Sequence, residues 1–502
     1  MLAAIQSAAV LGIDAYDVTV EVDATNGLPQ WTIVGLPVGA VKESRERVGS
    51  ALVNSGFMLP PRRITINLAP ADVRKEGTAF DLPIALGILV ATEQLPFDSL
   101  KDRVFVGELG LDGSVRGIRG TLSIARRASL RGNGTELVIP TVNVGEASRV
   151  GALRIVAPEN LRALANELAN GSLSRAQSIV STTPPATTDV DFADVVGQTA
   201  AKRALEVAAA GGHNLLMTGP PGAGKTMLAR RLSGILPELT EAESLEVIAI
   251  QSVAGVLPAS VPSTCPRPFR APHHSISSAG LIGGGSNPRP GEVSLAHHGV
   301  LFLDEMLEFP RCVLEGLRQP MEDGRVVIAR ASMSVVFPAR FTLVGATNPC
   351  PCGRLGDGTS ACSCSTTDVE RYARRMSGPL ADRIDMRVNV GRVPLSDLSS
   401  AKSEESSPAM RSRVSLARQR QQSRYAHMKG VSCNAHAAGR WIDTNGVVTP
   451  SGRRMLHRAA EGLQLSARGY HRVLKVARTI ADLDESDSVA VPHVAEALRY
   501  RE

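Results

Sequence analysis

Residues 214–236 read NLLMTGPPGAGKTMLARRLSGIL, in which an apolar stretch, a glycine-rich turn and a helix-like stretch follow one another directly. The turn, GPPGAGKT, has the spacing of a phosphate-binding loop, whose glycines let backbone amides converge on phosphates. Lys225 is placed to reach the β- and γ-phosphates, and the hydroxyl of Thr226 to ligate magnesium. We therefore expect a strand, a nucleotide-binding loop and a helix in succession. The predicted loop residues are Gly219, Pro220, Pro221, Gly222, Ala223, Gly224, Lys225 and Thr226.

Two later stretches carry the remaining chemistry of nucleotide hydrolysis. GVLFLDEM puts Asp304 and Glu305 at the end of an apolar strand, where the aspartate is expected to hold magnesium and the glutamate to polarise water. The next apolar stretch, residues 341–346, leads to Asn348, which is placed to sense the γ-phosphate. These strands alternate with helical segments, a pattern typical of a parallel sheet wrapped by helices. The central region is thus predicted to be a P-loop ATPase core of the α/β class.

Two polar, low-complexity stretches divide the 502 residues. The first is rich in Ser, Thr and Pro, as an interdomain linker would be, and the second reads PLSDLSSAKSEESSPAM. The predicted organisation is an N-terminal α/β domain over residues 1–170, a linker over 171–190, the ATPase core over 191–393, a linker over 394–410, and a helical lid domain over 411–502.

Charge is unevenly distributed along the chain. The formal net charge is +6, but residues 410–478 hold fourteen Lys or Arg against only Asp443 and Glu461, a local charge of +12 that leaves −6 for the remainder. A basic block on an acidic body is a candidate nucleic-acid surface, although a solvated arginine-rich helical face would give the same count. Aromatic residues make up 3%, which argues against binding built on aromatic base stacking. We expect any nucleic acid to be held through its phosphates.

The termini and cysteines indicate the compartment. Residues 1–22 have no Lys or Arg before the apolar positions, unlike a secretory leader, and the longest apolar run, residues 82–91, is far too short to span a bilayer. We therefore expect a cytoplasmic protein with no membrane contact.

Four of the seven cysteines form CPC, nine intervening residues and CSC, which suits a tetrahedral zinc, with reduced thiols or a redox switch as alternatives. The predicted zinc ligands are Cys350, Cys352, Cys362 and Cys364.

Six stretches resemble the magnesium-chelatase-like group of AAA+ ATPases, and most closely the competence protein ComM (YifB) family. They are FADVVGQTAAKRALEVAAAGGHNLLMTGPPGAGKT, FRAPHHSIS, RPGEVSLAHHGVLFLDEM, ATNPCPCG, SGPLADRIDMRV and SARGYHRVLKVARTIADL. They lie between residues 192 and 483, and the family's N-terminal domain is also recognisable. The resemblance covers nearly the whole chain.

The resemblance implies roles for residues that would otherwise pass as ordinary surface groups. Val196, Gly197 and Gln198 would lie near the adenine, and Asn348 would be the first sensor. Arg383 resembles the arginine finger that reaches a neighbouring subunit's nucleotide, and a finger that acts in trans implies a homohexameric ring.

Other matched stretches imply a lid sensor and pore contacts. Arg468 resembles the second-sensor arginine of the lid. The insertion with Gly283, Gly284, Gly285 and Arg289, and a hairpin around Ala331 and Ser332 that presents Arg330, would face the ring pore. The pairs His273/His274 and His297/His298 are expected to be structural or pore-loop residues rather than metal ligands.

The N-terminal domain resembles the proteolytic domain of Lon-type proteases. The nucleophile position falls on Ala79, within KEGTAFDLP, and the lysine position falls on Thr121 or Leu122. Without a serine and a lysine, that dyad does not hydrolyse peptides. We expect this domain to serve as an assembly or DNA-contacting platform.

The resemblance implies an ATP-dependent hexameric DNA motor, with ATP and Mg²⁺ as cofactors, that promotes branch migration during homologous recombination in natural transformation. Two alternatives remain open. One is a protein-remodelling ATPase like the magnesium-chelatase motor subunit, and the other is a nucleotide-controlled regulatory scaffold.

Overall fold

The computed structural model describes residues 2–132, 134–151, 153–176, 190–258, 265–285, 288–330, 333–356, 361–393 and 404–501. The chain forms two compact units, which are described separately. The first contains residues 1–185 and also residues 241–265, and the second contains residues 186–240 and 266–502. The segment Glu241–Cys265 lies within the predicted ATPase core in sequence, yet it belongs to the unit built by the N-terminal domain.

A mixed seven-stranded sheet, in the order β3-β4-β2-β1-β5-β8-β9, forms the first unit. Alternation dictates β2, since Val18, Val20 and Val22 are buried while the residues between them are partly exposed. The predicted α/β character of this domain is confirmed by strands such as β2 and β4 and by the helices that follow them in the sequence. The bounds are β1 (Leu2–Leu11), β2 (Asp14–Thr25), β3 (Gln30–Val34), β4 (Arg63–Ala69), β5 (Arg103–Phe105), β8 (Glu136–Val138) and β9 (Arg154–Val156).

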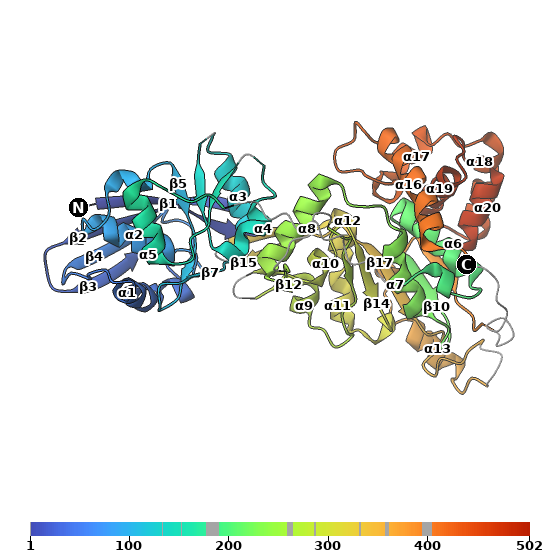
Figure 1. The fold of residues 1–502 in the computed structure, drawn as a ribbon. Helices are drawn as coiled ribbons and strands as arrows, with labels where there is room; N and C mark the ends of the chain where they lie inside the picture. The colour runs from blue at the N-terminus through green and yellow to red at the C-terminus, as the bar shows by residue number, and fades with distance from the viewer. Residues whose placement is uncertain are drawn as a thin grey trace. The chain divides into compact units, whose positions relative to one another are not determined.

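Helices cover this sheet (Figure 1), and every residue of α2 (Asp81–Ala91) is buried. Gly87 allows the close approach, because a Cβ there would lie 2.5 Å from Cγ2 of Val22. The other α-helices in this unit are α1 (Ser44–Asn54), α3 (Thr121–Ser129), α4 (Val144–Ala147), α5 (Leu161–Asn170) and α8 (Glu241–Ala254).

Helix α8 joins the first unit through its packing on α3. Ile248 and Ala249 pack in one buried cluster with Leu122, and the Ser252 hydroxyl accepts a 3.0 Å hydrogen bond from the Gly120 amide. Burial raises the pKa of the Glu146 carboxyl. Hydrogen bonds from Ser252 and Asn143 partly offset this rise. The excursion that follows the phosphate-loop helix is therefore an integral part of the N-terminal fold.

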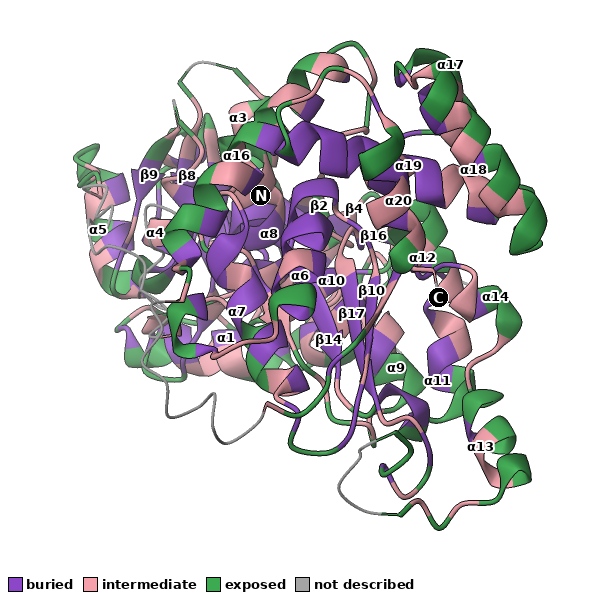
Figure 2. Cartoon of the chain, turned by 90° about the vertical axis from the view of Figure 1, so that its right-hand side faces the viewer, coloured by how far each residue is buried: buried purple, intermediate pink, exposed green. Residues whose placement is uncertain are grey.

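Five parallel strands, in the order β11-β14-β17-β10-β18, form the sheet of the second unit. The predicted parallel sheet is confirmed, and its central strands are buried (Figure 2). Thr218 at the end of β10 lies opposite Thr347 at the end of β17, and Leu303 at the end of β14 lies opposite Gly345. The bounds are β10 (Leu215–Thr218), β11 (Phe269–Arg270), β14 (Val300–Leu303), β17 (Thr342–Thr347) and β18 (Met386–Asn389).

A helical C-terminal region shares one hydrophobic core with this sheet and with α6 (Thr199–Gly211). Its helices are α16 (Ser407–Arg424), α17 (Gly439–Asn445), α18 (Pro450–Gly462), α19 (Ala467–Leu483) and α20 (Val491–Arg499). Within the described part of the chain, every helix is too short or too polar to cross a lipid bilayer.

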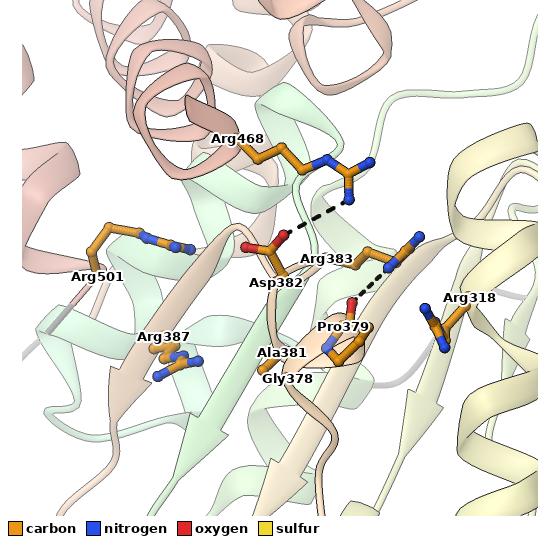
Figure 3. A pocket seen from close by; sticks show the side chains of 9 residues that line it. All are labelled: Arg318, Gly378, Pro379, Ala381, Asp382, Arg383, Arg387, Arg468 and Arg501. Carbon is orange, nitrogen blue, oxygen red and sulfur yellow. Dashed lines mark hydrogen bonds and ion pairs between the residues drawn. The ribbon is translucent and has the colours of Figure 1, made fainter. Parts of the chain in front are cut away.

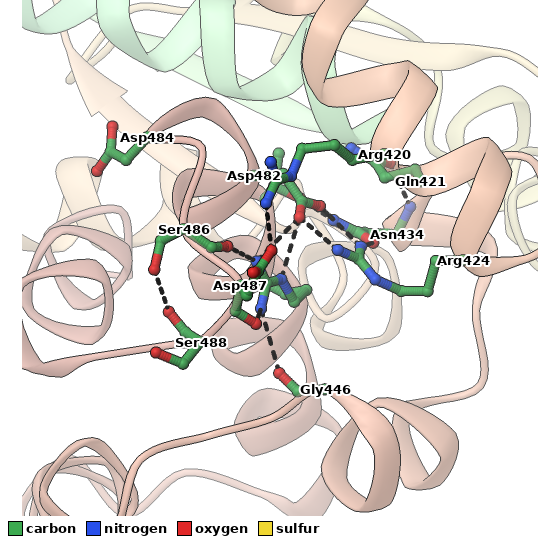
Figure 4. Close-up of polar contacts among 12 residues, drawn as sticks. Arg420, Gln421, Arg424, Asn434, Gly446, Asp482, Asp484, Ser486, Asp487 and Ser488 are labelled. Carbon is green, nitrogen blue, oxygen red and sulfur yellow. Dashed lines mark hydrogen bonds and ion pairs between the residues drawn. The ribbon is translucent and has the colours of Figure 1, made fainter.

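A buried ionic network ties the helical region together (Figure 4). Asp482 is fully buried in α19 and accepts hydrogen bonds from Arg424 at 2.8 Å, Arg478 at 2.9 Å and the Asn434 amide at 2.9 Å. Burial lowers the pKa of Arg478, and the charge of the Asp482 carboxylate opposes that change.

Replacing Asp482 tests how far the lid depends on that network. Asp482→Asn leaves the buried guanidinium of Arg478 and the partly buried one of Arg424 without a counter-charge, so we expect the free energy of unfolding to fall by about 3–5 kcal/mol. Asp487→Asn removes an exposed carboxylate that also pairs with an arginine, and it should change stability by less than about 1 kcal/mol. Urea unfolding followed by circular dichroism measures both. Equal stabilities for the two variants would contradict the assignment.

Candidate nucleotide and subunit-interface sites

The phosphate loop follows β10 and ends at α7 (Lys225–Ile235). Gly222 and Gly224 have φ values of 80° and 88°, in the left-handed region that favours glycine. Gly219 is required for a different reason, since a Cβ there would lie 2.1 Å from the carbonyl oxygen of Val390. The three glycines of the motif thus fix the backbone of the loop at the N-terminus of α7.

Lys225 is buried within the loop that it serves. Its Nζ donates hydrogen bonds to the carbonyls of Gly219 at 2.5 Å and Pro220 at 3.0 Å, and to Oδ1 of Asn348 at 3.2 Å. Burial lowers the pKa of this lysine, and the negative charges of Asp304 and Glu305 oppose that change. A phosphate in the loop would exchange neutral acceptors for an anion, which strengthens these hydrogen bonds.

Thr226 and Asp304, the two predicted magnesium ligands, are in contact. The Thr226 hydroxyl donates a 2.7 Å hydrogen bond to Oδ2 of Asp304, and Oδ1 of Asp304 accepts one from the amide of Glu305. Hydroxyl and carboxylate oxygens suit Mg²⁺, which binds few protein ligands and keeps waters and phosphate oxygens as the rest. The residues therefore fit a magnesium-bound nucleotide, which would supply the phosphoanhydride bond and the cation that neutralises its charge.

Glu305 is half-exposed and has a left-handed backbone, with φ of 48°. Nδ1 of His274 lies 3.7 Å from its carboxylate. From the sequence we expect a structural or pore-loop role for His274, since it lies in a stretch matched to the family and no acidic partner pattern supports metal ligation. In the structure this histidine lies next to Glu305, the residue predicted to polarise water.

The segment expected near the adenine adjoins the phosphate loop. Gln198 donates from Nε2 to the carbonyls of Gly391 at 2.6 Å and Ala223 at 3.3 Å, with a left-handed φ of 55°. Glu404 holds the same segment, because its carboxylate accepts hydrogen bonds from the Gly197 amide at 2.8 Å and from Lys202 at 2.7 Å. Glu404 lies in the predicted linker 394–410, and of that linker residues 394–403 lie outside the described residues.

Arg383 and Arg468 line one pocket of about 600 Å³ (Figure 3). Arg383 is buried, donates to the carbonyl of Pro379 at 2.6 Å and pairs with Glu322 at 2.5 Å. The side chain of Arg468 is 66% exposed and lies 4.0 Å from Asp382 and 3.9 Å from Glu322. Arg383 holds the pKa of Glu322 below its usual range, so this carboxylate stays ionised.

Three further arginines line the same pocket, and sequence patterns did not single them out. They are Arg318, Arg387 and Arg501. Among the nine described residues that line the pocket, Asp382 alone carries a carboxylate. None of these nine residues belongs to the phosphate loop. The pocket is therefore strongly attractive to an anion that this chain's own loop does not present there.

The four clustered cysteines lie together, with their Sγ atoms within 4.8 Å of one another. The backbone amides of Arg354 and Ser363 bond the sulfur of Cys352 and lower its pKa to about 5. A thiolate is the form that binds metals. Part of the loop between the pairs, residues 357–360, lies outside the described residues.

Both predicted hairpins form. Gly283–Gly284 (β12) pairs antiparallel with Arg289–Pro290 (β13), and Arg325–Arg330 (β15) pairs with Met333–Pro338 (β16). Arg289 and Arg330 are exposed. Residues 286–287 and the expected tip residues Ala331 and Ser332 lie outside the described residues.

The residues that the sequence resemblance assigns to a protease dyad lack the groups that such a dyad needs. Thr121 and Leu122 are fully buried in the first turn of α3, and Ala79 is half-buried just before α2. None carries an amine or a serine hydroxyl.

Most cations of the basic block over residues 410–478 are engaged in contacts within the protein. Ten of the fourteen bond protein carbonyls or pair with carboxylates, and many of those carboxylates lie outside the block in sequence, such as Glu206, Asp385 and Asp482. The exposed remainder includes Lys429, Arg440, Arg454 and Arg458. Most of these cations therefore serve contacts within the protein, which neither a DNA surface nor a solvated face requires.

Comparison with known proteins identifies the family. Models of the magnesium chelatase subunit ChlI match residues 191–398 and 20–143, and a model of the ChlI C-terminal region matches residues 404–501. The competence protein ComM of Haemophilus influenzae is 45% identical over 100% of this chain and 97% of its own length. The chain belongs to the ComM/YifB family of magnesium-chelatase-like proteins.

Other relatives separate the family from the chelatases themselves. The YifB protein of Salmonella typhimurium is 43% identical over 100% of this chain and 97% of its own length. The magnesium-chelatase 67 kDa subunit of Chlorobaculum parvum is 30% identical over only 32% of this chain and 23% of its own length. ComM/YifB proteins therefore share their full organisation with this chain, whereas the chelatase subunit shares one part. The family is related to AAA+ ATPases, in agreement with the phosphate loop.

Lys225→Ala tests the nucleotide site. The variant loses charge-assisted hydrogen bonds to phosphate worth about 1.5–3 kcal/mol, so we expect the affinity for MgATP to fall at least about tenfold. Titration with a fluorescent ATP analogue measures the change. Lys429→Ala, which removes an exposed lysine of the lid, should bind as the wild type does. Unchanged affinity in Lys225→Ala would place the nucleotide elsewhere.

Proposed function

We propose that this protein is an ATP-dependent, hexameric DNA motor that promotes branch migration during homologous recombination in natural transformation. The full-length similarity to a competence protein, together with the complete set of nucleotide-site groups, carries the proposal. The proposed location is the cytoplasm. Its cofactors are ATP and Mg²⁺, with a structural Zn²⁺ held by the four clustered cysteines.

In the proposed reaction each residue acts on a different part of the nucleotide. Lys225 and the loop amides bind the β- and γ-phosphates, while Thr226 and Asp304 hold magnesium. Glu305 accepts a hydrogen bond from the attacking water and orients it, and Asn348 contacts the γ-phosphate from the adjacent strand. Val196, Gly197 and Gln198 form the adenine side of the site. Attack by water on the γ-phosphorus of ATP breaks the bond to the β–γ bridging oxygen, so that ADP and inorganic phosphate leave.

Arg383 is proposed to act on the nucleotide of a neighbouring subunit, and Arg468 is proposed to be the second-sensor arginine of the lid. The pocket that they line has five arginines and includes no residue of the chain's own phosphate loop among its described lining. An anion supplied by a second copy would neutralise the excess positive charge of this pocket. Repeating that contact around a closed ring gives the proposed homohexamer.

DNA is proposed to be held through its backbone by the two hairpins, with Arg289 and Arg330 facing the pore. Both arginines are exposed, whereas most cations of the lid are engaged in protein contacts. The N-terminal domain is proposed to be an inactive Lon-like platform, since Ala79, Thr121 and Leu122 replace the dyad. Affinity for DNA should fall steeply with salt and depend little on base sequence.

A protein-remodelling ATPase is the second candidate function. The similarity of about one third of the chain to a magnesium-chelatase subunit favours it. A regulatory scaffold with slow hydrolysis would use the same nucleotide groups. DNA stimulation of the ATPase rate separates both from a DNA motor.

A junction assay tests the proposed function. Purified wild type should move three-strand and four-way DNA junctions only with MgATP, and Lys225→Ala should not move them. Arg289→Ala/Arg330→Ala should lose DNA binding by about tenfold or more while keeping its basal ATPase rate, because its nucleotide site is intact. A wild type without ATP-dependent junction movement would contradict the motor proposal.

Mixing experiments test whether Arg383 acts in trans. Arg383→Ala should bind MgATP normally but hydrolyse it at least about 10³-fold more slowly, since an arginine finger contributes that much to the rate. Mixed with Lys225→Ala subunits, it should regain part of the wild-type rate, because each variant supplies what the other lacks. The absence of any recovery in rings that contain both variants would show that Arg383 acts within its own subunit.

A further inference from the structure

The described residues of the segment 350–364, called here the cysteine knuckle, have the geometry of a metal site. The sulfur of Cys350 lies 3.4 Å from that of Cys352 and 3.6 Å from that of Cys362, and the last two are 3.6 Å apart. Four sulfurs about 2.3 Å from a tetrahedral zinc would be about 3.8 Å apart. A disulfide would instead need about 2.05 Å. The sulfurs are spaced for a shared cation.

The surroundings of the sulfurs also favour a metal. Backbone amides bond three of them, with the Arg354 and Ser363 amides on Cys352, the Cys364 amide on Cys362 and the Cys352 amide on Cys364. Such N–H donors fix the direction of the sulfurs, as groups around bound metals do. Cys350 is fully buried, so an uncompensated charge there would be costly.

The knuckle touches the phosphate loop at one residue. Gly353 is buried, with φ of 76°, and a Cβ there would lie 2.6 Å from Cδ of Pro221 and 3.8 Å from Cγ of Asn348. Asn348 stands two residues before Cys350 and accepts the hydrogen bond from Lys225. The turn of the knuckle thus packs against the loop and against the residue placed to contact the γ-phosphate.

The other end of the knuckle leads to the arginine pocket. Ser365 follows Cys364 directly and caps α13 (Thr366–Ala373) with a capping box that includes Asp368. Helix α14 (Gly378–Ala381) comes next, and two residues later the chain reaches Arg383. The knuckle therefore stands between Asn348 and the pocket-lining arginine along the chain.

We propose that a zinc ion in the cysteine knuckle makes the nucleotide site competent, because it fixes the turn at Gly353 that supports Pro221 and Asn348. The inference rests on the proposed ATP site but not on any role of DNA. Gly353 and the cysteines are positioning residues in this proposal. Without the metal the turn is no longer held in place. Pro221 of the phosphate loop and Asn348 then lose the fixed packing surface that Gly353 provides.

Metal content and nucleotide binding test the proposal in the full-length protein. Wild type should contain one zinc per chain and, with Co²⁺ in its place, show the visible absorption of tetrahedral thiolate-bound cobalt. Chelation should weaken binding of a fluorescent ATP analogue by at least about tenfold, and added Zn²⁺ should restore it. Cys352→Ser/Cys364→Ser should lack zinc and bind like the chelated protein, whereas Cys312→Ser, at an exposed cysteine, should retain both properties.

Two glycine variants keep the test valid if the cysteine variants fail to fold. Gly353→Ala retains all four ligands but pushes its Cβ against Pro221, so it should keep one zinc and bind the ATP analogue at least about tenfold more weakly. Gly356→Ala is the matched control, because its φ of 74° imposes the same strain in open space. Its affinities for zinc and for the ATP analogue should lie within about twofold of the wild-type values.

Three results would overturn the inference. They are a folded wild type that neither contains nor takes up zinc, a zinc-free protein that binds the ATP analogue as tightly as the zinc form, and equal nucleotide affinities for Gly353→Ala and Gly356→Ala. Disulfide formation between the knuckle cysteines in the active protein would do the same. None of these readouts involves DNA, so failure of the motor proposal would leave them unchanged.

Discussion

The position of β17 between β10 and β14 is the constraint on which the nucleotide site depends. Parallel strands bring their carboxyl ends to one edge of the sheet, so the phosphate loop, Asp304 and Asn348 emerge side by side. The contacts of Lys225 with Asn348 and of Thr226 with Asp304 follow from that order. A different strand order would separate these groups although each local motif were unchanged.

The sequence alone predicted the parts of this site that local backbone chemistry determines. Glycine spacing and the flanking apolar strands are enough to predict the phosphate loop and the positions of Asp304 and Asn348. Glu404 and His274 escaped prediction because their contacts with Gly197 and Glu305 join distant segments. The membership of α8 in the first unit escaped for the same reason, since its pairing with Leu122 depends on a buried cluster that no linear pattern reveals.

Charge shows the difference between counting along the chain and counting in space. The block over residues 410–478 is strongly basic as a sequence, but its arginines meet carboxylates contributed from elsewhere, and Asp482 alone satisfies two of them. In contrast, the arginine pocket draws Arg318, Arg387 and Arg501 from separate segments to join Arg383 and Arg468. The excess of cations along the sequence therefore reflects contacts within the fold, whereas the excess in the pocket arises only when the fold brings separate segments together.

The pair between Arg383 and Glu322 gives the proposed ring a way to couple its subunits. Within one chain Glu322 stays ionised and holds Arg383 at 2.5 Å. A γ-phosphate carries more negative charge than one carboxylate and presents several acceptor oxygens, so it would compete for the same guanidinium when a neighbour binds ATP. Release of phosphate would return Arg383 to Glu322. A side chain can respond to nucleotide state when it has two alternative partners that bind it with similar free energy.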